Sequence, residues 1–545
     1  MSKLEGSRGK SSSGILPLSA SFNLTGHRLP CAHGWINFAD KRGKCFSRLA
    51  SRASVAGEVL LVNFKYLLNE EVEAFVLAPG KGVVCEGSEH KCRSLRPSRT
   101  LDLGGRVVVP GLRDAHTHLL PTALSYRLLD LRRVSSVEEL KGAVRTAALE
   151  MGPGSWVVGR GWDQDKMVEK RYPTRHDLDE AAPENPVLLV RVCGHAAVAN
   201  TKALEKLGLL FQEPEELQGM VVREDGKPTG LLLEDAVPWA LARVPKPGRA
   251  ALKELLRKVV AEYLRYGVTV VHSMSVDIEE LSLIRGLELD GELKLRYEAY
   301  VKPELLGNVP EELRHLVRGV KAFADGSFGA RTAALREQYS DHPSSGTLLM
   351  TAEEIAELCR AAGSHGLELA VHAIGDKAVE EVLRAMTISR GKIRVEHASL
   401  TPPDLLELFS QLRPTAAVQP HFILSDTWIV DRLGARTRWV YAFKSLARTG
   451  STLMGSSDSP VEPLNPWLGM YAAVHRGEPE GLPIAEFTSS EKLSLREALS
   501  MYVERASRPE DVVVLNITRE PLSREDFARV RAERVFLKGV ELQPL

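Results

Sequence analysis

The sequence predicts an α/β protein built on a TIM-like (β/α)8 barrel, with an inserted subdomain and a small β-sandwich formed from both chain ends. Three observations lead to this prediction. Short apolar runs recur through the second half of the chain, and helical segments separate most of them. With one more run near residue 110 they number eight, the strand number of such a barrel. Further strand-like runs lie near both ends, where they can pair in one small unit.

The predicted barrel strands are short and rich in β-branched or aliphatic residues. The first is the run that starts at Val107 and passes through a Pro-Gly turn to His118. Because chemistry in such barrels collects at the C-terminal ends of the strands, the residues at those ends are the first place to look for a site. The other seven strands are expected at residues 267–272, 293–300, 319–323, 367–372, 393–397, 415–419 and 451–454.

Helical periodicity and capping residues place helices between these strands. Apolar residues recur at helical spacing from Leu252 to Leu264. A Thr-x-x-Glu capping pattern opens a helix at residues 351–362, and Gly450 ends one at residues 439–448. A similar pattern opens a helix at residues 135–150, before the barrel strands resume.

The chain divides into three predicted regions. Residues 1–56 are rich in Ser, Gly and basic residues and predict a poorly ordered basic extension; a targeting segment, a start codon placed too far upstream and a small ordered extension are the alternatives. Residues 57–109 and 505–545 hold the runs assigned to the β-sandwich. Residues 110–504 hold the barrel, with an insertion at about 123–248.

The composition excludes several classes of protein. Of the 545 residues, 44% are hydrophobic and 26% charged, and no run approaches the roughly 18 apolar residues of a membrane span. Residues 1–57 hold nine Lys or Arg and two acids, which leaves 62 basic and 69 acidic residues in the rest. An acidic body gives no electrostatic case for nucleic-acid binding. The six cysteines include no CxxC pair, which favours a reduced, cytoplasmic protein without membrane partners.

The segment ending at His118 carries the first chemical signal. Asp114, His116 and His118 alternate at every second position, so an extended backbone puts all three side chains on one face. Two imidazoles then converge on one point, and neutral imidazole is a common ligand for zinc and similar ions. A lone His-x-His is weak support for a metal site, because a strand-end histidine is more often a core residue.

The remaining ligands are expected at the ends of other strands. Lys321 lies on the fourth strand, His372 ends the fifth, His397 ends the sixth, and Asp458 follows the eighth. Each has an ordinary alternative: a hydrogen-bonded rim histidine, a lysine that reaches out to solvent, or a turn aspartate before Ser-Pro. Their joint placement at the same end of separate strands favours a single metal centre.

Several longer motifs contain these residues. They are Pro110-Gly-Leu-Arg-Asp-Ala-His-Thr-His118, Gly159-Arg-Gly-Trp-Asp-Gln164, Val320-Lys-Ala-Phe-Ala-Asp-Gly-Ser327, Ala330-Arg-Thr-Ala333, His372-Ala-Ile-Gly-Asp376, Glu396-His-Ala398 and Ser456-Ser-Asp-Ser-Pro-Val461. As an ordered set they resemble the amidohydrolase superfamily, and the match runs from about residue 57 to 515. Within it, the pattern is similar to the branch called YtcJ-like or amidohydrolase family 3.

This resemblance implies a complete ligand set. His116 and His118 would bind one divalent ion together with Asp458, and His372 and His397 a second. Two zinc ions are expected, with iron or manganese as alternatives. Lys321 would be carbamylated and bridge the ions, which is physically reasonable because an ammonium between two dications is unfavourable and the free amine can take up carbon dioxide.

The resemblance also implies the reaction. We expect a metal-dependent amidohydrolase that hydrolyses a C–N bond of an amide, N-acyl or cyclic amide, other than a peptide bond, through a metal-activated hydroxide. Asp458 would be the catalytic residue, taking the proton of the attacking water and passing it to the leaving amine. The alternatives are an esterase or lactonase, a phosphoester hydrolase on the same site, and a catalytically silent binding scaffold.

Contacts to the small-molecule substrate are the least constrained part of the prediction. Trp162, Asp163 and Gln164 in the insertion are candidates for lining the pocket, and His195 and Arg331 are two more. An aromatic residue beside two polar ones is equally typical of a packed turn. No nucleic-acid partner is expected, and a homodimer is left open.

Overall fold

The computed structural model describes residues 57–191, 196–212, 214–217, 220–504 and 508–542. The expectations about residues 1–56 and about His195 lie outside the described residues.

Eight parallel strands form the central sheet, in the order β18-β17-β16-β15-β14-β13-β12-β5. The outer members approach each other, because the backbone N–H of Asp458, just after β18, donates to the carbonyl of His116 on β5 at 2.7 Å. The result is a nearly closed barrel. Its strands are β5 (Leu112–Thr117), β12 (Val268–Val276), β13 (Arg296–Val301), β14 (Val317–Phe323), β15 (Glu368–Ala373), β16 (Ile393–His397), β17 (Thr415–Val418) and β18 (Thr452–Gly455).

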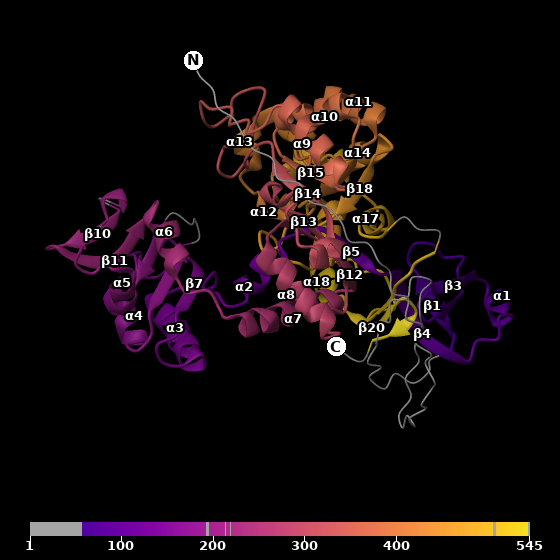
Figure 1. Cartoon of the computed structure of the whole chain (residues 1–545), viewed down its shortest axis with the longest axis horizontal. Helices are drawn as coiled ribbons and strands as arrows, with labels where there is room; N and C mark the ends of the chain where they lie inside the picture. Colours follow the sequence, from indigo (N-terminus) through magenta and orange to yellow (C-terminus); the bar gives the residue numbers. More distant parts are fainter. Residues whose placement is uncertain (1–56, 192–195, 213, 218–219, 505–507, 543–545) are drawn as a thin grey trace, which may run out of the picture. The chain divides into compact units, whose positions relative to one another are not determined.

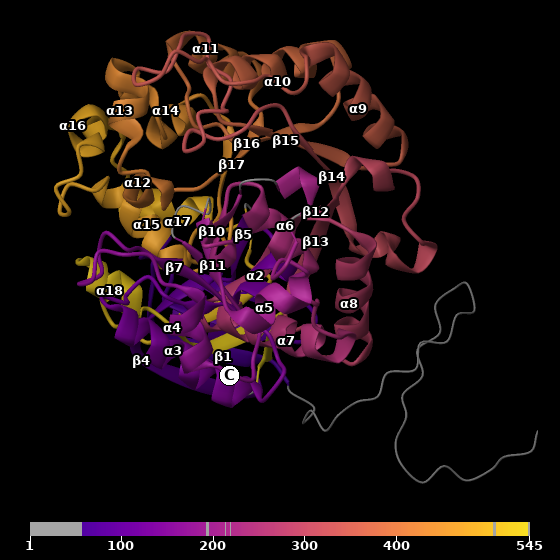
Figure 2. The same ribbon diagram turned by 90° about the vertical axis from the view of Figure 1, so that its left-hand side faces the viewer.

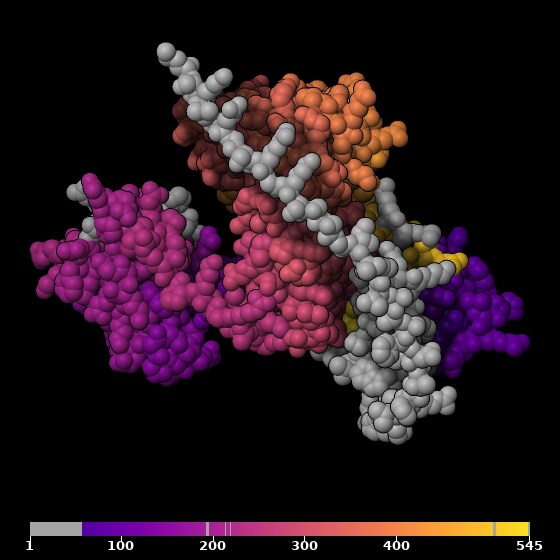
Figure 3. Space-filling model, in the orientation of Figure 1, coloured from indigo at the N-terminus to yellow at the C-terminus, as the bar shows by residue number. Residues whose placement is uncertain are grey.

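Helices cover the outside of this sheet, and the main hydrophobic core fills the space between (Figures 1 and 2). In the space-filling view, α7 and α8 form the rose-coloured outer surface of this part of the chain (Figure 3). The helices are α2 (Leu119–Ser125), α7 (Arg249–Arg265), α8 (Ile278–Leu289), α9 (Ala352–Ser364), α10 (Asp376–Ser389), α11 (Pro403–Leu412), α12 (Phe422–Ser425), α13 (Ile429–Leu433), α14 (Phe443–Arg448), α15 (Pro466–His475), α16 (Ile484–Thr488), α17 (Leu495–Met501) and α18 (Arg524–Arg529).

Local sequence signals explain most of these boundaries. The predicted box at the start of α9 is present, with the Thr351 side chain accepting from the N–H of Glu354 and the Glu354 side chain bonding back. The helix expected at 439–448 is shorter than predicted, because α14 begins only at Phe443. Tyr441 has a φ of 51°, and Val440 forms an isolated antiparallel bridge with Leu400. The chain is therefore not helical at residues 440–442, between the 3-10 helix Gly434–Trp439 and α14.

Strands from both chain ends share one seven-stranded sheet, in the order β21-β20-β19-β4-β1-β2-β3. The joining of the two ends is the feature of the predicted β-sandwich that the structure shows. The indigo strand β4 and the yellow strand β20 lie in this sheet with β19 between them (Figure 1). The strands are β1 (Val59–Tyr66), β2 (Ala74–Ala78), β3 (Gly82–Gly87), β4 (Arg99–Pro110), β19 (Val512–Leu515), β20 (Ala532–Leu537) and β21 (Val540–Glu541), and α1 (Glu89–Arg93) follows β3.

The residues between β5 and β12 in sequence contribute a third, six-stranded sheet, in the order β10-β11-β9-β8-β7-β6. Two hydrophobic clusters of this segment are separate from the barrel core. The elements are β6 (Leu129–Asp130), α3 (Val137–Met151), β7 (Val157–Trp162), α4 (Arg175–Ala181), β8 (Val187–Arg191), β9 (Ala196–Ala199), α5 (Thr201–Leu207), β10 (Val221–Glu224), β11 (Lys227–Leu233) and α6 (Ala236–Arg243).

Two cysteines of the seven-stranded sheet correct the expectation of a fully reduced chain. Cys85 and Cys92 form a disulfide with a Cα–Cα distance of 5.7 Å. Their separation of seven residues is not a CxxC spacing, so no motif in the sequence predicts the bond. Among the described residues, no helix is long and apolar enough to cross a membrane.

Gly111 joins β4 of the seven-stranded sheet to β5 of the barrel, and the structure leaves no room for a side chain at this position. A Cβ added there would lie 2.3 Å from Oγ1 of Thr269 and 2.7 Å from Cβ of Asp511. We therefore expect Gly111→Ala to lower the free energy of unfolding by roughly 1–3 kcal/mol, measured by denaturant unfolding. Gly363→Ala on exposed α9 is the control, since its Cβ meets nothing within 4 Å. Equal stability of the two variants would contradict this packing argument.

Candidate metal centre

A buried carboxylate holds the first barrel strand against the loop after β18. Oδ1 of Asp114 accepts from the N–H of Ser457 at 3.0 Å, and Oδ2 accepts from the Ser457 hydroxyl at 2.5 Å. Tyr263 on α7 also donates to Oδ2, at 3.3 Å. Burial raises the pKa of Asp114 to about 6. Asp114 is therefore not one of the candidate metal ligands. It fixes β5 beside the loop that carries Asp458.

His116, His118 and Asp458 come together as the sequence predicts. One ligand atom from each lies within 4.8 Å of the others. Oδ1 of Asp458 lies 3.4 Å from Nε2 of His116 and 3.2 Å from Nε2 of His118. Burial alone would raise the pKa of Asp458, but the neighbouring imidazoles hold it below its ordinary value. Three potential ligands thus face one small volume.

The other nitrogen of each imidazole is already engaged. Nδ1 of His116 donates to Oε2 of Glu396 at 2.5 Å, and Nδ1 of His118 donates to the carbonyl of Met274 at 3.1 Å. In a neutral imidazole the second nitrogen then carries a lone pair and no proton. Both Nε2 atoms therefore face the Asp458 oxygen as acceptors. Acceptor atoms that share no proton repel one another unless a cation lies between them. The two nitrogens and the carboxylate oxygen therefore suit a divalent metal as ligands.

His372 and His397 form the second half of the group. The ring centroids of His372 and His397 are 4.4 Å apart, and those of His397 and His116 are 4.8 Å apart. Nδ1 of His397 donates to Oε1 of Gln419 at 2.7 Å, whereas His372 uses Nε2 to donate to the carbonyl of Gly326 at 2.8 Å. Each ring again keeps one free lone pair.

Burial keeps these two imidazoles neutral, which is the form that binds metal. It lowers the pKa of His372 to about 3, with Lys321 adding to the effect, and it lowers the pKa of His397 well below the ordinary value.

Lys321 lies among the same groups on β14 and is almost completely buried. Its Nζ is 3.7 Å from the ring centroid of Phe323 and donates to the carbonyl of Ala322 at 3.2 Å. Burial lowers the pKa of this amine to about 8, against the opposing charges of Glu396 and Asp458. About a tenth of the amine is therefore neutral, and nucleophilic, at pH 7, far more than for an ordinary lysine.

The backbone at two of the strand ends is held in an unfavourable region. His397, Ala398 and Asp458 have φ values of 73°, 46° and 56°, where residues other than glycine are uncommon. Such conformations cost free energy and are found mostly where the surroundings impose them, often at functional sites. Two of the three residues here carry predicted ligands.

The family model described as the amidohydrolase family matches residues 99–508. The chain belongs to the amidohydrolase family. It is 33% identical over 433 residues to YtcJ of Bacillus subtilis (strain 168), a protein named as an amidohydrolase, with 74% of this chain and 80% of that protein covered. It is 26% identical over 462 residues to the N-substituted formamide deformylase of Arthrobacter pascens, covering 78% of this chain and 84% of that protein. A solved metal-dependent hydrolase from Pyrococcus horikoshii OT3 superposes with a TM-score of 0.70 at 34% identity, covering 82% of this chain and 91% of that one.

Sequence reasoning missed the residues that orient the ligands in this amidohydrolase. Glu396 contacts His116 from the position next to His397 on β16. Gln419, which orients His397, is itself fixed by donating to the Ser456 hydroxyl at 3.0 Å. Gln419 directly follows the strand β17, and Glu396 lies one residue before a predicted ligand on β16, so each position carried a usable signal. Their partners, however, come from distant strands.

Four of the predicted substrate residues have protein partners in the structure. Trp162 is fully buried in the core of the six-stranded sheet, and its Nε1 donates to the carbonyl of Leu189 at 2.9 Å. Asp163 and Gln164 both bind Arg191, at 2.8 and 2.7 Å. Arg331 forms a two-point ion pair with Asp341 at 3.2 and 2.8 Å. In this structure each of these side chains is occupied by a protein partner.

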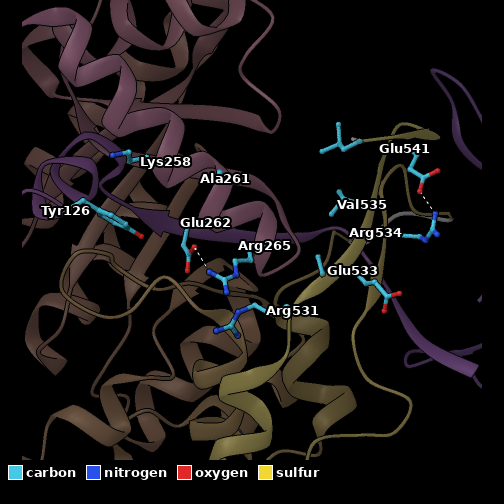
Figure 4. A pocket seen from close by; sticks show the side chains of 12 residues that line it. Tyr126, Lys258, Ala261, Glu262, Arg265, Arg531, Glu533, Arg534, Val535 and Glu541 are labelled. Carbon is cyan, nitrogen blue, oxygen red and sulfur yellow. Dashed lines mark hydrogen bonds and ion pairs between the residues drawn. The ribbon is translucent and has the colours of Figure 1, made fainter. Parts of the chain in front are cut away.

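A pocket of about 850 Å³ beside α7 and β20 lies apart from this chemistry (Figure 4). Its charged lining is paired in part within the pocket, Arg265 with Glu262 and Arg534 with Glu541. None of the six predicted metal ligands lines it. The metal centre is therefore the better candidate for the active site of this amidohydrolase.

Two acidic residues in the segment after β17, Asp426 and Glu462, form close hydrogen bonds. His421 pairs closely with Glu462, and the Tyr441 hydroxyl donates to Asp426. Burial raises the pKa of Asp426 to about 7, and the charge of Glu462 adds to the rise.

A raised carboxyl pKa predicts a loss of stability as the pH increases. The unfolded chain releases the Asp426 proton near its ordinary pKa of 3.8, whereas the folded chain keeps it until about pH 7. This group therefore lowers stability progressively between those two values, by roughly 1–3 kcal/mol between pH 5 and pH 8. Denaturant unfolding at both pH values should show a smaller decrease for Asp426→Asn than for the wild type. An identical decrease in both proteins would refute the assignment.

Proposed function

We propose that this amidohydrolase is a metal-dependent enzyme that hydrolyses a C–N bond of an amide, N-acyl or cyclic amide compound. The observation that supports it most directly is the common direction of the imidazole lone pairs. His116 and His118 turn Nε2 toward the same carboxylate oxygen, while Nδ1 of each ring donates to another acceptor.

The proposed ligands are the six side chains predicted from the sequence. His116, His118 and Asp458 would hold one divalent cation, and His372 and His397 a second. Lys321 would bridge them as a carbamate, formed when its neutral amine adds to carbon dioxide and loses a proton. Its burial and its pKa of about 8 support this modification. Zinc is the ion we propose, since it accepts nitrogen and carboxylate oxygen ligands together.

A divalent cation at such a site supplies an acidic water, with a pKa lowered to about 7, and polarises a substrate carbonyl. The protein supplies the remaining proton transfers. The Asp458 carboxylate is ionised at neutral pH, because its pKa lies below the ordinary value. It can therefore accept the proton of the attacking water and return it to the departing nitrogen.

Family membership and one relative support a nitrogen leaving group. The formamide deformylase of Arthrobacter pascens is named for a C–N cleavage, and its similarity spans most of this chain. A substrate panel should therefore begin with N-formyl and N-acyl amines and cyclic amides. Dipeptides, esters, lactones and phosphoesters belong in the same panel, because turnover of one of these alone would replace the proposed substrate class.

Metal content tests the ligand set directly. Full-length protein produced with zinc and bicarbonate should contain about two zinc ions per chain by elemental analysis. Lys321→Ala should contain fewer, because the bridging ligand is removed. Lys253→Ala is a matched control, since Lys253 pairs with Asp290 on the surface. Two ions per chain in Lys321→Ala would argue against the bridge, and none in the wild type would refute the metal centre.

Asp458→Asn separates metal binding from proton transfer. The amide keeps one oxygen for the metal and cannot act as a base at neutral pH. We expect most of the zinc to remain while kcat on the best panel substrate falls by at least about 10²-fold. Asp290→Asn, a surface carboxylate paired with Lys253, is the control. Unchanged kcat in Asp458→Asn would exclude the proton-transfer role.

A further inference from the structure

An arginine lies inside the barrel beneath the metal centre. Arg394 is on β16 and only 2% exposed. Small or apolar residues such as Ala115, Ala370 and Met274 lie buried in the same part of the barrel. A buried guanidinium costs free energy unless its charge is paired and its donors are satisfied. Its presence in the barrel therefore requires an explanation.

Every donor of Arg394 has a partner. Nε donates to Oε1 of Glu396. Nη1 donates to Nδ1 of His272 at 2.9 Å and to the Tyr300 hydroxyl at 3.0 Å. Nη2 donates to the carbonyl of Ala115 at 2.9 Å and reaches Sδ of Met274 at 3.7 Å. The planar fork is therefore fixed by four different strands.

Three of these contacts lead to metal ligands. Glu396 is fully buried and uses its second oxygen to accept from Nδ1 of His116 at 2.5 Å. Ala115, whose carbonyl Arg394 also holds, precedes His116 on β5. Met274, which touches Nη2, provides the carbonyl that orients His118. Arg394 thus fixes the supports of both histidines that face Asp458.

We propose that Arg394 is a positioning residue of the metal centre, which holds the Glu396 carboxylate against Nδ1 of His116 and so keeps Nε2 of that ring directed at the metal. The inference rests on the proposed metal site and adds to it a residue outside the ligand set. Without the guanidinium, Glu396 would be a buried anion whose remaining partner is the His116 ring. Glu396 would then take up a proton or turn away, and the hydrogen bond that sets the tautomer and orientation of that ring would weaken.

Zinc affinity measures this role without any substrate. We compare full-length wild type, Arg394→Met, Glu396→Gln and the double variant, each stripped of metal and titrated with zinc against a competing chelator. Arg394→Met should bind zinc about 10–100-fold more weakly, the range expected when an outer partner of a ligand is lost. Cobalt loaded in place of zinc should give an altered visible absorption spectrum in the same variant, because the His116 ring is no longer fixed.

The double variant decides whether Arg394 acts through Glu396. If it does, the double variant should bind zinc no more weakly than Glu396→Gln alone, since the link is already broken. Tyr300→Phe is the matched control: it removes another hydrogen bond of Arg394 and leaves Glu396 paired. Its zinc affinity should stay within about threefold of the wild type, although its melting temperature falls.

Several results would overturn the proposal. These are unchanged zinc affinity in Arg394→Met, losses that multiply in the double variant, or an equal loss in Tyr300→Phe, which would indicate a general effect on the core. Should Arg394→Met not fold, Arg394→Gln is judged by the same affinity criterion. A wild-type protein that binds no zinc would refute the metal centre itself, whereas binding that is indifferent to Arg394 would refute only the positioning role.

Discussion

The fixed orientation of four imidazoles is the constraint on which the site depends. Each histidine gives one ring nitrogen to an oxygen of the protein: a carboxylate for His116, a side-chain amide for His397, and backbone carbonyls for His118 and His372. The opposite nitrogens are left as acceptors, and burial keeps the rings of His116, His372 and His397 uncharged. A cation is the partner that such a group of neutral acceptors and one carboxylate lacks.

The barrel makes this arrangement possible because it brings strand ends together. The predicted ligands come from β5, β14, β15, β16 and the loop after β18, and parallel pairing places these ends on one rim. Two hydrogen bonds bring the outer strands of the barrel sheet together beside the site. Asp114 accepts from the N–H of Ser457, and the carbonyl of His116 accepts from the N–H of Asp458. The same two strands that nearly close the barrel therefore also place Asp458 beside the two histidines.

The sequence predicted candidate site residues where the pattern lies within a single strand. Alternation predicted that His116 and His118 share a face, and both lie close to Asp458. Strand-end placement proposed Lys321, His372 and His397 as further ligands, and the rings of His372 and His397 lie side by side. The sequence was uninformative where the partner lies on a distant strand. Nothing in the order of residues links Arg394 to Ala115 or Gln419 to His397, because these contacts exist only after the barrel closes. The same holds for Cys85 and Cys92, which a short helix brings together.

An anomalous-difference map from crystals grown with zinc would locate the bound ions and their ligand atoms. We predict a zinc peak bound by Nε2 of His116, Nε2 of His118 and the Asp458 carboxylate, with Nδ1 of His116 still bonded to Glu396. A peak bound through Nδ1 of His116, or zinc found only at other surfaces of the protein, would contradict it.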